Sequence, residues 1–333
     1  MKRKQKNKTK NEHYVPKCYL KSWQNDKGHV VVYDKESNKI WENNISDVAC
    51  ERYYYDIDYK KLSAQKIDML KKLGIDAEED EQFIEHFLSG QVESVYSTLL
   101  AKIIDREITP WHEKNCYFIT PKDKLDFALC LAFQYIRTNK TRQMILDANN
   151  CLGQAFKDMN ASEEMTSNYI LDEGEEKSIQ GNMILDVDNI LELTLSFCRL
   201  TWILGVNRTT NAFYTSDNPI GTREHVKHPF MSMAGIRSKG VEVYIPLSPS
   251  YILLMYDGAY HTDLMSYDRR YVSLTETEDI ELYNKLCAYN SNRFVFSKDG
   301  EYRLIEQIVE KDPKAFHFPT MTLSWGGKEY VPR

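Results

Sequence analysis

The order of the hydrophobic patterns along the chain is the feature that most restricts its fold. Strand-like runs occur near both ends, and helical periodicity fills the middle. A parallel βαβ array requires strands and helices that alternate, so this order indicates an α+β fold instead. We expect an N-terminal hairpin, a group of central helices and a C-terminal sheet that is mostly antiparallel.

The N-terminal hairpin is predicted from two runs rich in β-prone residues. His29–Tyr33 and Lys39–Glu42 have the composition of strands, and residues 34–38 between them contain turn-forming side chains. A further extended run is expected at Arg52–Asp56.

Helices are predicted from apolar residues spaced at about 3.6 positions. Such spacing extends from Glu81 to Ile104 and recurs from about Asp188 to Arg199. Another helix begins after Thr120 and Pro121, which suit an N-cap and a first helical position. Its expected buried stripe consists of Leu125, Ala128, Leu129, Ala132, Phe133 and Ile136. Residues 158–182 are polar and irregular, which favours a loop, an insertion or a mobile lid.

The last third of the chain is predicted to be rich in strands. Thr201–Val206 and Ala212–Thr215 are expected to form a hairpin. Further strands are expected at Val241–Ile245, Tyr251–Met255 and Arg293–Ser297, and a helix is expected at Glu276–Tyr289.

Charge divides the chain into a basic start and an acidic remainder. The first ten residues hold six of the 43 Lys and Arg residues and none of the 49 Asp and Glu residues, so the remainder has 37 positive against 49 negative charges. We expect residues 1–12 to be a disordered basic tail and residues 13–333 to be one α+β domain. An acidic body argues against a broad face for nucleic acid, but it is compatible with a local groove.

Cysteine usage and hydropathy predict the compartment. The seven cysteines include no CxxC pair and no zinc-knuckle spacing. This pattern fits a reducing cytosol, and we expect a cytoplasmic protein. No apolar run approaches the ~18 residues of a membrane span, so no membrane partner is expected.

His13 is the first candidate for a chemical role. It opens the segment His-Tyr-Val-Pro, in which Pro16 holds Val15 extended. A fixed imidazole can act as a general acid, a general base or a metal ligand. The alternative is a histidine that is satisfied by a backbone carbonyl at the end of a strand.

Polar residues of the central helices form the second group of candidates. Gln134, Arg137 and Thr141 are expected on one face of the second helix, where the Arg137 guanidinium suits a carboxylate or a phosphate. Glu85 and Glu93 lie about two turns apart on the preceding helix, and either could bind a divalent cation or pair with Arg137. The alternative for both sets is an ordinary solvated helix face.

The third group lies in the last third of the chain. Asp217 and Asn218 precede Pro219 at the end of a strand, where they suit a metal ligand or a general base with its orienting partner. The alternative is a turn that satisfies its own hydrogen bonds. Asn284 could be a structural cap near the end of the last helix. The sequence contains no Walker loop, GxGxxG, HExxH or GxSxG motif.

Several segments together resemble a known family. In chain order they are HYVPKCYLKSW, VESVYSTLLAKI, FQYIRTNKTR, YTSDNPI, PLSPSYILL and RFVFS. Their order and spacing resemble the bacterial domain-of-unknown-function family 4238, which implies no settled activity. The recurrent polar residues of the family correspond to His13, Glu93, Gln134, Arg137, Asp217, Asn218 and Asn284. One departure is Asn139, which stands where the family pattern leads us to expect proline.

Two classes of function are compatible with these residues. The first is a hydrolase of nucleic acid or nucleotide, nuclease-like or a phosphoester hydrolase, in a phage-defence setting. The second is a non-enzymatic recognition or regulatory module, or a nucleotide sensor, so the sequence leaves open whether the chain is an enzyme. The hydrolase hypothesis assigns catalysis to His13, Asp217 and Asn218, substrate binding to Gln134, Arg137 and Asn284, and a divalent metal such as Mg²⁺ to Glu93 and Asp217.

Overall fold

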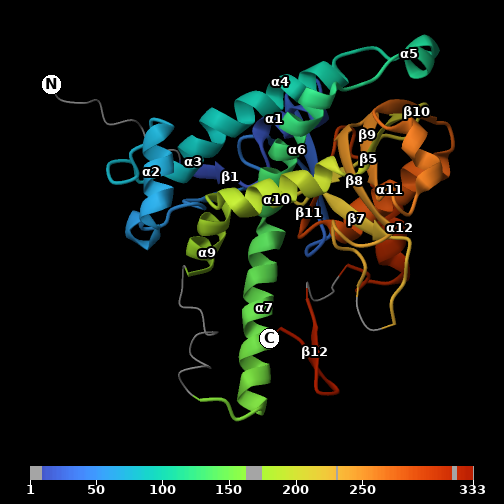
Figure 1. The fold of residues 1–333 in the computed structure, drawn as a ribbon. Helices are drawn as coiled ribbons and strands as arrows, with labels where there is room; N and C mark the ends of the chain where they lie inside the picture. The colour runs from blue at the N-terminus through green and yellow to red at the C-terminus, as the bar shows by residue number, and fades with distance from the viewer. Residues whose placement is uncertain (1–9, 163–174, 230–231, 317–320, 333) are drawn as a thin grey trace.

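The computed structural model describes residues 10–162, 175–229, 232–316 and 321–332. The central helices and the five-stranded sheet occupy different parts of the molecule. In Figure 1 the helices α4, α6 and α10 lie in one half of the molecule, and the strands β5, β8, β9 and β10 lie in the other half. The predicted α+β fold is confirmed.

The N-terminal hairpin is confirmed and belongs to a sheet that joins the two ends of the chain. β2 (His29–Asp34) pairs with β3 (Lys39–Asn44). The other edge of β2 pairs with β11 (Phe294–Ser297), which in turn pairs with β6 (Thr215–Ser216). The sheet order is therefore β3-β2-β11-β6.

A second, two-stranded sheet holds the His-Tyr-Val-Pro segment. β1 (Asn11–His13) pairs with β4 (Cys50–Arg52), and His13 lies opposite Cys50. The extended run that we predicted for residues 52–56 is wrong beyond Arg52. Tyr53 has a φ of 53°, so the chain turns there and leaves the strand.

The first predicted helix is present, with a local irregularity. α3 (Phe83–Phe87) continues through a π-helical turn, η3 (Leu88–Val92), into α4 (Glu93–Ile104). The backbone N–H of Glu93 donates to the carbonyl of Leu88, five positions earlier. A single π-turn shifts the side chains that follow it around the helix axis, and such turns are frequent at functional sites.

The second predicted helix begins as expected but ends early. α6 (Pro121–Ile136) is capped by the Thr120 side chain, and α7 (Asn139–Asp158) follows almost at once. Our placement of Gln134, Arg137 and Thr141 on one helix is therefore wrong. The Thr138 hydroxyl accepts from the backbone N–H of Thr141 and caps a new helix.

The predicted loop at residues 158–182 is only partly testable. Residues 163–174 lie outside the described residues, and α9 (Glu175–Ile184) is a helix, so the prediction is wrong for residues 175–182. Gln180, Gly181 and Ile184 of this helix are buried, a packed face that the polar composition of the segment did not indicate. The third predicted helix is confirmed as α10 (Val187–Cys198).

The C-terminal sheet is mostly antiparallel, as predicted. Its order is β10 (Arg270–Leu274), β5 (Thr201–Asn207), β9 (Tyr251–Tyr256), β8 (Val241–Ser248) and β7 (Gly221–Glu224), and only the β10–β5 pair is parallel. The hairpin expected from Thr201–Val206 and Ala212–Thr215 is wrong. β5 pairs with β9 and β10, whereas Thr215 belongs to the other sheet.

The remaining elements complete the two halves. The predicted helix at Glu276–Tyr289 is confirmed as α11 (Thr277–Asn290). In Figure 1 α7 extends away from the other helices, and the hairpin of β12 and β13 lies beside it. The other elements are α1 (Lys17–Leu20), η1 (Lys21–Trp23), η2 (Tyr59–Lys61), α2 (Ala64–Lys72), α5 (Pro110–Asn115), η4 (Thr262–Tyr267), α12 (Arg303–Lys311), β12 (Leu323–Trp325) and β13 (Lys328–Tyr330).

The largest hydrophobic core lies where the helices meet the five-stranded sheet. Tyr96 of α4, Phe127 of α6 and Trp202 of β5 are fully buried there. The ring centroid of Phe127 lies 5.4 Å from that of Tyr96 and 6.0 Å from that of Trp202. No helix of the described residues is long and apolar enough to cross a membrane.

Candidate functional site

Arg137 is the centre of a buried polar cluster at the end of α6. Only 1% of this residue is exposed, and its Nη1 donates to Glu93 Oε1 at 3.0 Å. Glu93 is the first residue of α4 and follows the π-helical turn. The pairing that we considered for these two residues is confirmed. Burial lowers the pKa of Arg137, but the combined effects of Glu93, Tyr55 and Glu85 raise it above its usual range, so the guanidinium stays charged.

The other nitrogens of Arg137 have no partner. Within the described residues, its Nε and Nη2 are buried without a hydrogen bond, as are both amide atoms of Gln134 and the Tyr96 hydroxyl. Each buried polar group that is left without a hydrogen bond lowers the free energy of unfolding by about 1–3 kcal/mol. Nε and Nη2 form one edge of the guanidinium plane, the edge that binds two oxygens of a carboxylate or phosphate side by side. This edge is therefore suited to an oxyanion.

Glu85 is a second carboxyl group whose charge interacts with this arginine. Burial raises the pKa of Glu85 to about 7, and the charges of Glu93 and Glu12 raise it further against the opposing effect of Arg137. A carboxyl group that titrates near neutral pH can both accept and donate a proton there.

His13 borders the same cluster. Its Nε2 lies 3.1 Å from the carbonyl oxygen of Ile45, and since a carbonyl only accepts, Nε2 is the protonated nitrogen. Burial and the nearby Lys17 charge lower the pKa of His13 to about 4. The imidazole is therefore neutral near pH 7, and its Nδ1 carries the lone pair.

Glu12 supports the cluster and was missed by sequence reasoning. Its carboxylate is fully buried and accepts from the Tyr55 backbone N–H at 2.6 Å and from Gln82 Nε2 at 2.8 Å. The Tyr55 hydroxyl in turn donates to the backbone carbonyl of His13. The sequence analysis placed residues 1–12 in a basic tail and therefore did not consider this carboxylate as part of a site. Tyr96 was missed as well, although its hydroxyl is buried without a partner among the described residues.

Asp217 and Asn218 lie in a different polar group. Both Asp217 oxygens accept backbone N–H groups at 2.7–2.8 Å, from Asn292, Arg293 and Phe294. Burial raises the pKa of Asp217 against these hydrogen bonds. Asn218 Nδ2 donates to the carbonyl of Asn290 at 3.1 Å. The two residues thus hold the turn between α11 and β11, and their predicted catalytic role stays a prediction.

Two lysines share this second group. Lys35 Nζ donates to the carbonyls of Ser291 and Ala288 near the end of α11, and Lys140 Nζ donates to the carbonyl of Asn290. Burial lowers the pKa of Lys35 to about 8, although the charge of Asp217 acts in the opposite direction. These cations cap carbonyls that the helix leaves without partners.

Asn284 is separate from both groups in its hydrogen bonding. Its Oδ1 accepts from the Tyr214 backbone N–H at 2.7 Å, and its Nδ2 donates to the carbonyl of Ala212 at 2.9 Å. It therefore fixes the segment that leads into β6. The substrate-binding role predicted for Asn284 stays a prediction.

The predicted metal ligands have different partners. Glu93 pairs with Arg137, whereas Asp217 accepts from three backbone groups. Across residues 10–162, 175–229, 232–316 and 321–332, no three or more His, Cys, Asp and Glu side chains are grouped to hold a metal ion. The assignment of Mg²⁺ to this pair stays a prediction.

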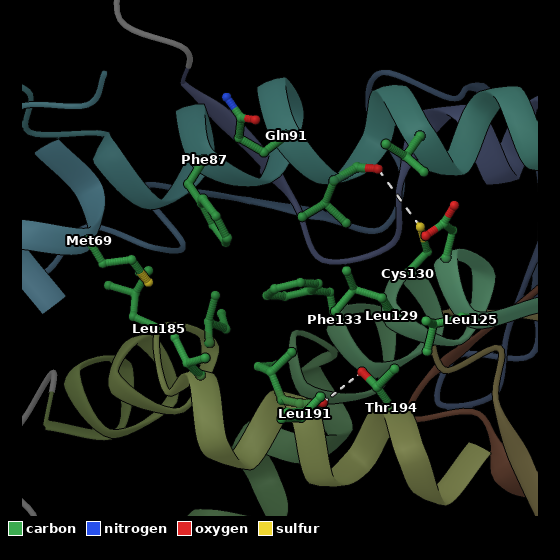
Figure 2. A pocket seen from close by; sticks show the side chains of 16 residues that line it. Met69, Phe87, Gln91, Leu125, Leu129, Cys130, Phe133, Leu185, Leu191 and Thr194 are labelled. Carbon is green, nitrogen blue, oxygen red and sulfur yellow. Dashed lines mark hydrogen bonds between the residues drawn. The ribbon is translucent and has the colours of Figure 1, made fainter. Parts of the chain in front are cut away.

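An apolar groove with a volume of about 560 Å³ is lined by other residues of these helices. Figure 2 shows it between the helix pair α3–α4, α6 and α10, with the rings of Phe87 and Phe133 pointing inward. Leu125 and Leu129, which we expected in the core, are 46% and 41% exposed here, so that prediction is wrong. The helices do not cover this face of α6. The residues that define the groove include Phe87, Val92, Leu125, Leu129, Phe133 and Leu191.

The fold and the cluster define an α+β protein with a buried arginine whose Nε and Nη2 edge has no partner in the part of the chain that the structure describes. The family model described as "Protein of unknown function (DUF4238)" matches residues 11–301, and the chain belongs to this family. The match includes all seven predicted site residues. No curated protein and no solved structure matches the chain.

Proposed function

We propose that the protein is a phosphoester hydrolase acting on a nucleotide or nucleic acid, in which Arg137 binds the phosphoryl group. The observation that carries this proposal is the buried Nε and Nη2 edge of Arg137, which has no partner among the described residues. A phosphate supplies two oxygens at the spacing of this edge, and its binding would satisfy both nitrogens.

Glu85 is proposed as the group that moves the proton. In hydrolysis, a water oxygen forms the new bond to phosphorus while the bond from phosphorus to the leaving oxygen breaks. Glu85, whose pKa is about 7, takes the proton from the water and passes it to the leaving oxygen. His13 accepts a hydrogen bond at Nδ1 and the Gln134 amide orients an oxygen, so both act as positioning residues.

Small substrates fit this cluster better than long nucleic acid. The body of the chain is acidic, so it would repel an extended phosphate backbone. Glu93 also neutralises part of the Arg137 charge. The phage-defence setting stays a prediction from sequence.

The test compares matched variants of the purified chain on a panel of nucleotides and short RNA and DNA. Arg137→Lys keeps the charge and loses the bidentate edge, and Glu85→Gln keeps the shape and loses the proton. Each should lower turnover at least a hundredfold. Glu192→Gln, on the exposed ion pair with Arg237, is the control. Turnover that both variants retain would overturn the proposal, as would a lack of hydrolysis across the panel.

A nucleotide sensor is the second candidate, favoured by the Glu93–Arg137 pair. A phosphate that competes with Glu93 for the guanidinium would release the first residue of α4, which is a local switch. Binding that raises the melting temperature of the wild type but not of Arg137→Lys, without any turnover, would favour the sensor.

A further inference from the structure

Three helices turn apolar side chains into one open groove. α6 supplies a row at a spacing of four residues, Leu125, Leu129 and Phe133, which we call the α6 row (Figure 2). α4 supplies Val95 and α10 supplies Leu191 to the same groove. Four of these five side chains are between 41% and 51% exposed, and only Phe133 is buried. In monomeric proteins, contiguous patches of large exposed apolar side chains are rare, so this face is suited to a partner.

The groove favours an occupant that is apolar and uncharged. Its Thr194 hydroxyl already donates to the Ile190 carbonyl at 2.7 Å, and the Gln91 amide points away from the other side chains (Figure 2). Of the described residues that line the groove, Asp126 alone is charged, and it pairs with Lys122 at 3.7 Å. A polar ligand would lose its hydration here without compensation, and a strongly acidic or basic partner would gain no attraction. The complementary surface is therefore a neutral ridge of hydrocarbon.

The chain itself carries such a ridge on α10. Val187, Leu191 and Leu195 recur every four residues, so they lie along one face of the helix, which we call the α10 stripe. Val187 and Leu191 form one side of the groove, and the stripe continues past it at Leu195. All three are between 40% and 59% exposed. Rows at a spacing of four on one helix pack between rows of the same spacing on another, so the α10 stripe matches the α6 row.

From these two neighbouring surfaces we infer that the protein is a homodimer, in which the α10 stripe of each copy lies in the groove of the other. Ridge and groove share one face of the chain, so a two-fold axis forms both contacts at once. Leu191 then stands opposite Leu129 of the partner subunit, and the half-exposed side chains of this face are removed from water. The inference goes beyond the proposed function and does not involve Arg137, so the two stand or fall separately.

Sedimentation velocity of the full chain over a range of micromolar concentrations tests the dimer. Leu129→Asp and Leu191→Asp each place a charge in an apolar contact and should weaken dimerisation at least about a hundredfold. Ile40→Asp, at a similarly exposed position on β3, is the matched control and should dimerise as the wild type does. Arg137→Lys should also dimerise normally, whatever its effect on turnover.

Mixing two variants identifies the surfaces that meet. Copies with Leu191→Asp and copies with Leu129→Lys should each be monomeric alone and should form a heterodimer when mixed. One contact of the heterodimer pairs aspartate with lysine, and the other keeps both leucines. A mixture of Leu191→Asp with Leu129→Asp should stay monomeric, because one contact then holds two negative charges. Recovery on mixing also shows that the variants are folded, since unfolded chains would not associate in this way.

Three results would overturn the inference. A wild type that stays monomeric at every concentration would leave the groove to another protein or to a small apolar ligand. A dimer that persists in both Leu129→Asp and Leu191→Asp would use a different face of the chain. A dimer that these variants dissociate, but that the mixed aspartate and lysine copies do not restore, would contradict the placement of the α10 stripe against the α6 row.

Discussion

Glu93 Oε1 lies 3.0 Å from Arg137 Nη1, and the glutamate side chain is 19% exposed while that of the arginine is 1% exposed. Glu93 therefore shields one side of a buried charge from water and leaves the Nε and Nη2 edge free. This division explains how the interior holds an arginine with spare hydrogen-bonding capacity. The ion pair offsets the cost of burying the charge, and the Nε and Nη2 atoms are without a partner among the described residues.

Glu93→Gln should destabilise the protein and make its stability depend on the phosphate concentration. The substitution leaves the Arg137 charge buried without a counterion, which we expect to lower the free energy of unfolding by about 2–4 kcal/mol. Urea denaturation at low salt measures this loss. Inorganic phosphate should restore part of it, because it supplies the missing negative charge. The double variant with Arg137→Met should not respond to phosphate, and an equal response would contradict the role given to the free edge.

His13 should make the protein less stable as the pH falls from 6.5 to 4. Its pKa is lowered from 6.5 to about 4 by burial, so the unfolded chain binds a proton in this window that the folded chain does not. Stability therefore rises with pH there, and the contribution reaches roughly 3 kcal/mol. Urea denaturation of wild type and His13→Gln across pH 4–7 should show a difference that shrinks towards pH 4. A constant difference would refute the lowered pKa.

Glu85 should act in the opposite direction over a largely overlapping pH window. Its pKa is raised from 4.5 to about 7, so the folded chain keeps a proton that the unfolded chain has lost, and this stabilisation disappears as the pH rises through 7. Glu85→Gln should therefore gain stability relative to the wild type between pH 4.5 and 7. Glu192→Gln, on the surface, serves as the control with no such trend.

Asp217→Ala should lower the stability of the fold, and any loss of activity should follow from this loss of stability. The substitution removes the acceptor for three backbone N–H groups, and we expect the free energy of unfolding in urea denaturation to fall by about 3–5 kcal/mol. Asp299→Ala, at the nearby exposed turn, is the comparison and should change stability by less than about 0.5 kcal/mol. Unchanged stability with lost activity would instead support the catalytic role predicted from sequence.

Asn139→Pro should be tolerated. Asn139 is the first residue of α7, where proline is favoured, and Thr138 before it has a ψ of 155°, which suits a residue that precedes proline. We expect the free energy of unfolding to change by no more than about 1 kcal/mol, with the lost Asn139–Glu51 hydrogen bond offsetting a gain in backbone rigidity. Ala148→Pro in the middle of the same helix should cost about 3 kcal/mol. Similar losses in both would contradict the helix boundary.

Local sequence signals determined much of the fold. The hairpin, the helix that starts at Thr120 and the strands around Pro246 all depend on neighbouring residues, so turn chemistry, capping and periodicity were sufficient. The order of strands and helices fixed the α+β class for the same reason. The pair of Glu93 with Arg137 could also be predicted as one option, because opposite charges on neighbouring helices attract one another.

Only the tertiary structure decided the pairing of distant segments and the burial of particular faces. β6 joined β11 instead of β5, and Leu129 remained half exposed while Gln134 and Arg137 were buried. Periodicity identifies the stripes of a helix, but it cannot tell which stripe a neighbouring element will cover. The separation of Asp217 from the hydrogen bonds of the Arg137 cluster has the same origin, since residue type is a local property and the partner of a side chain is set by the whole fold.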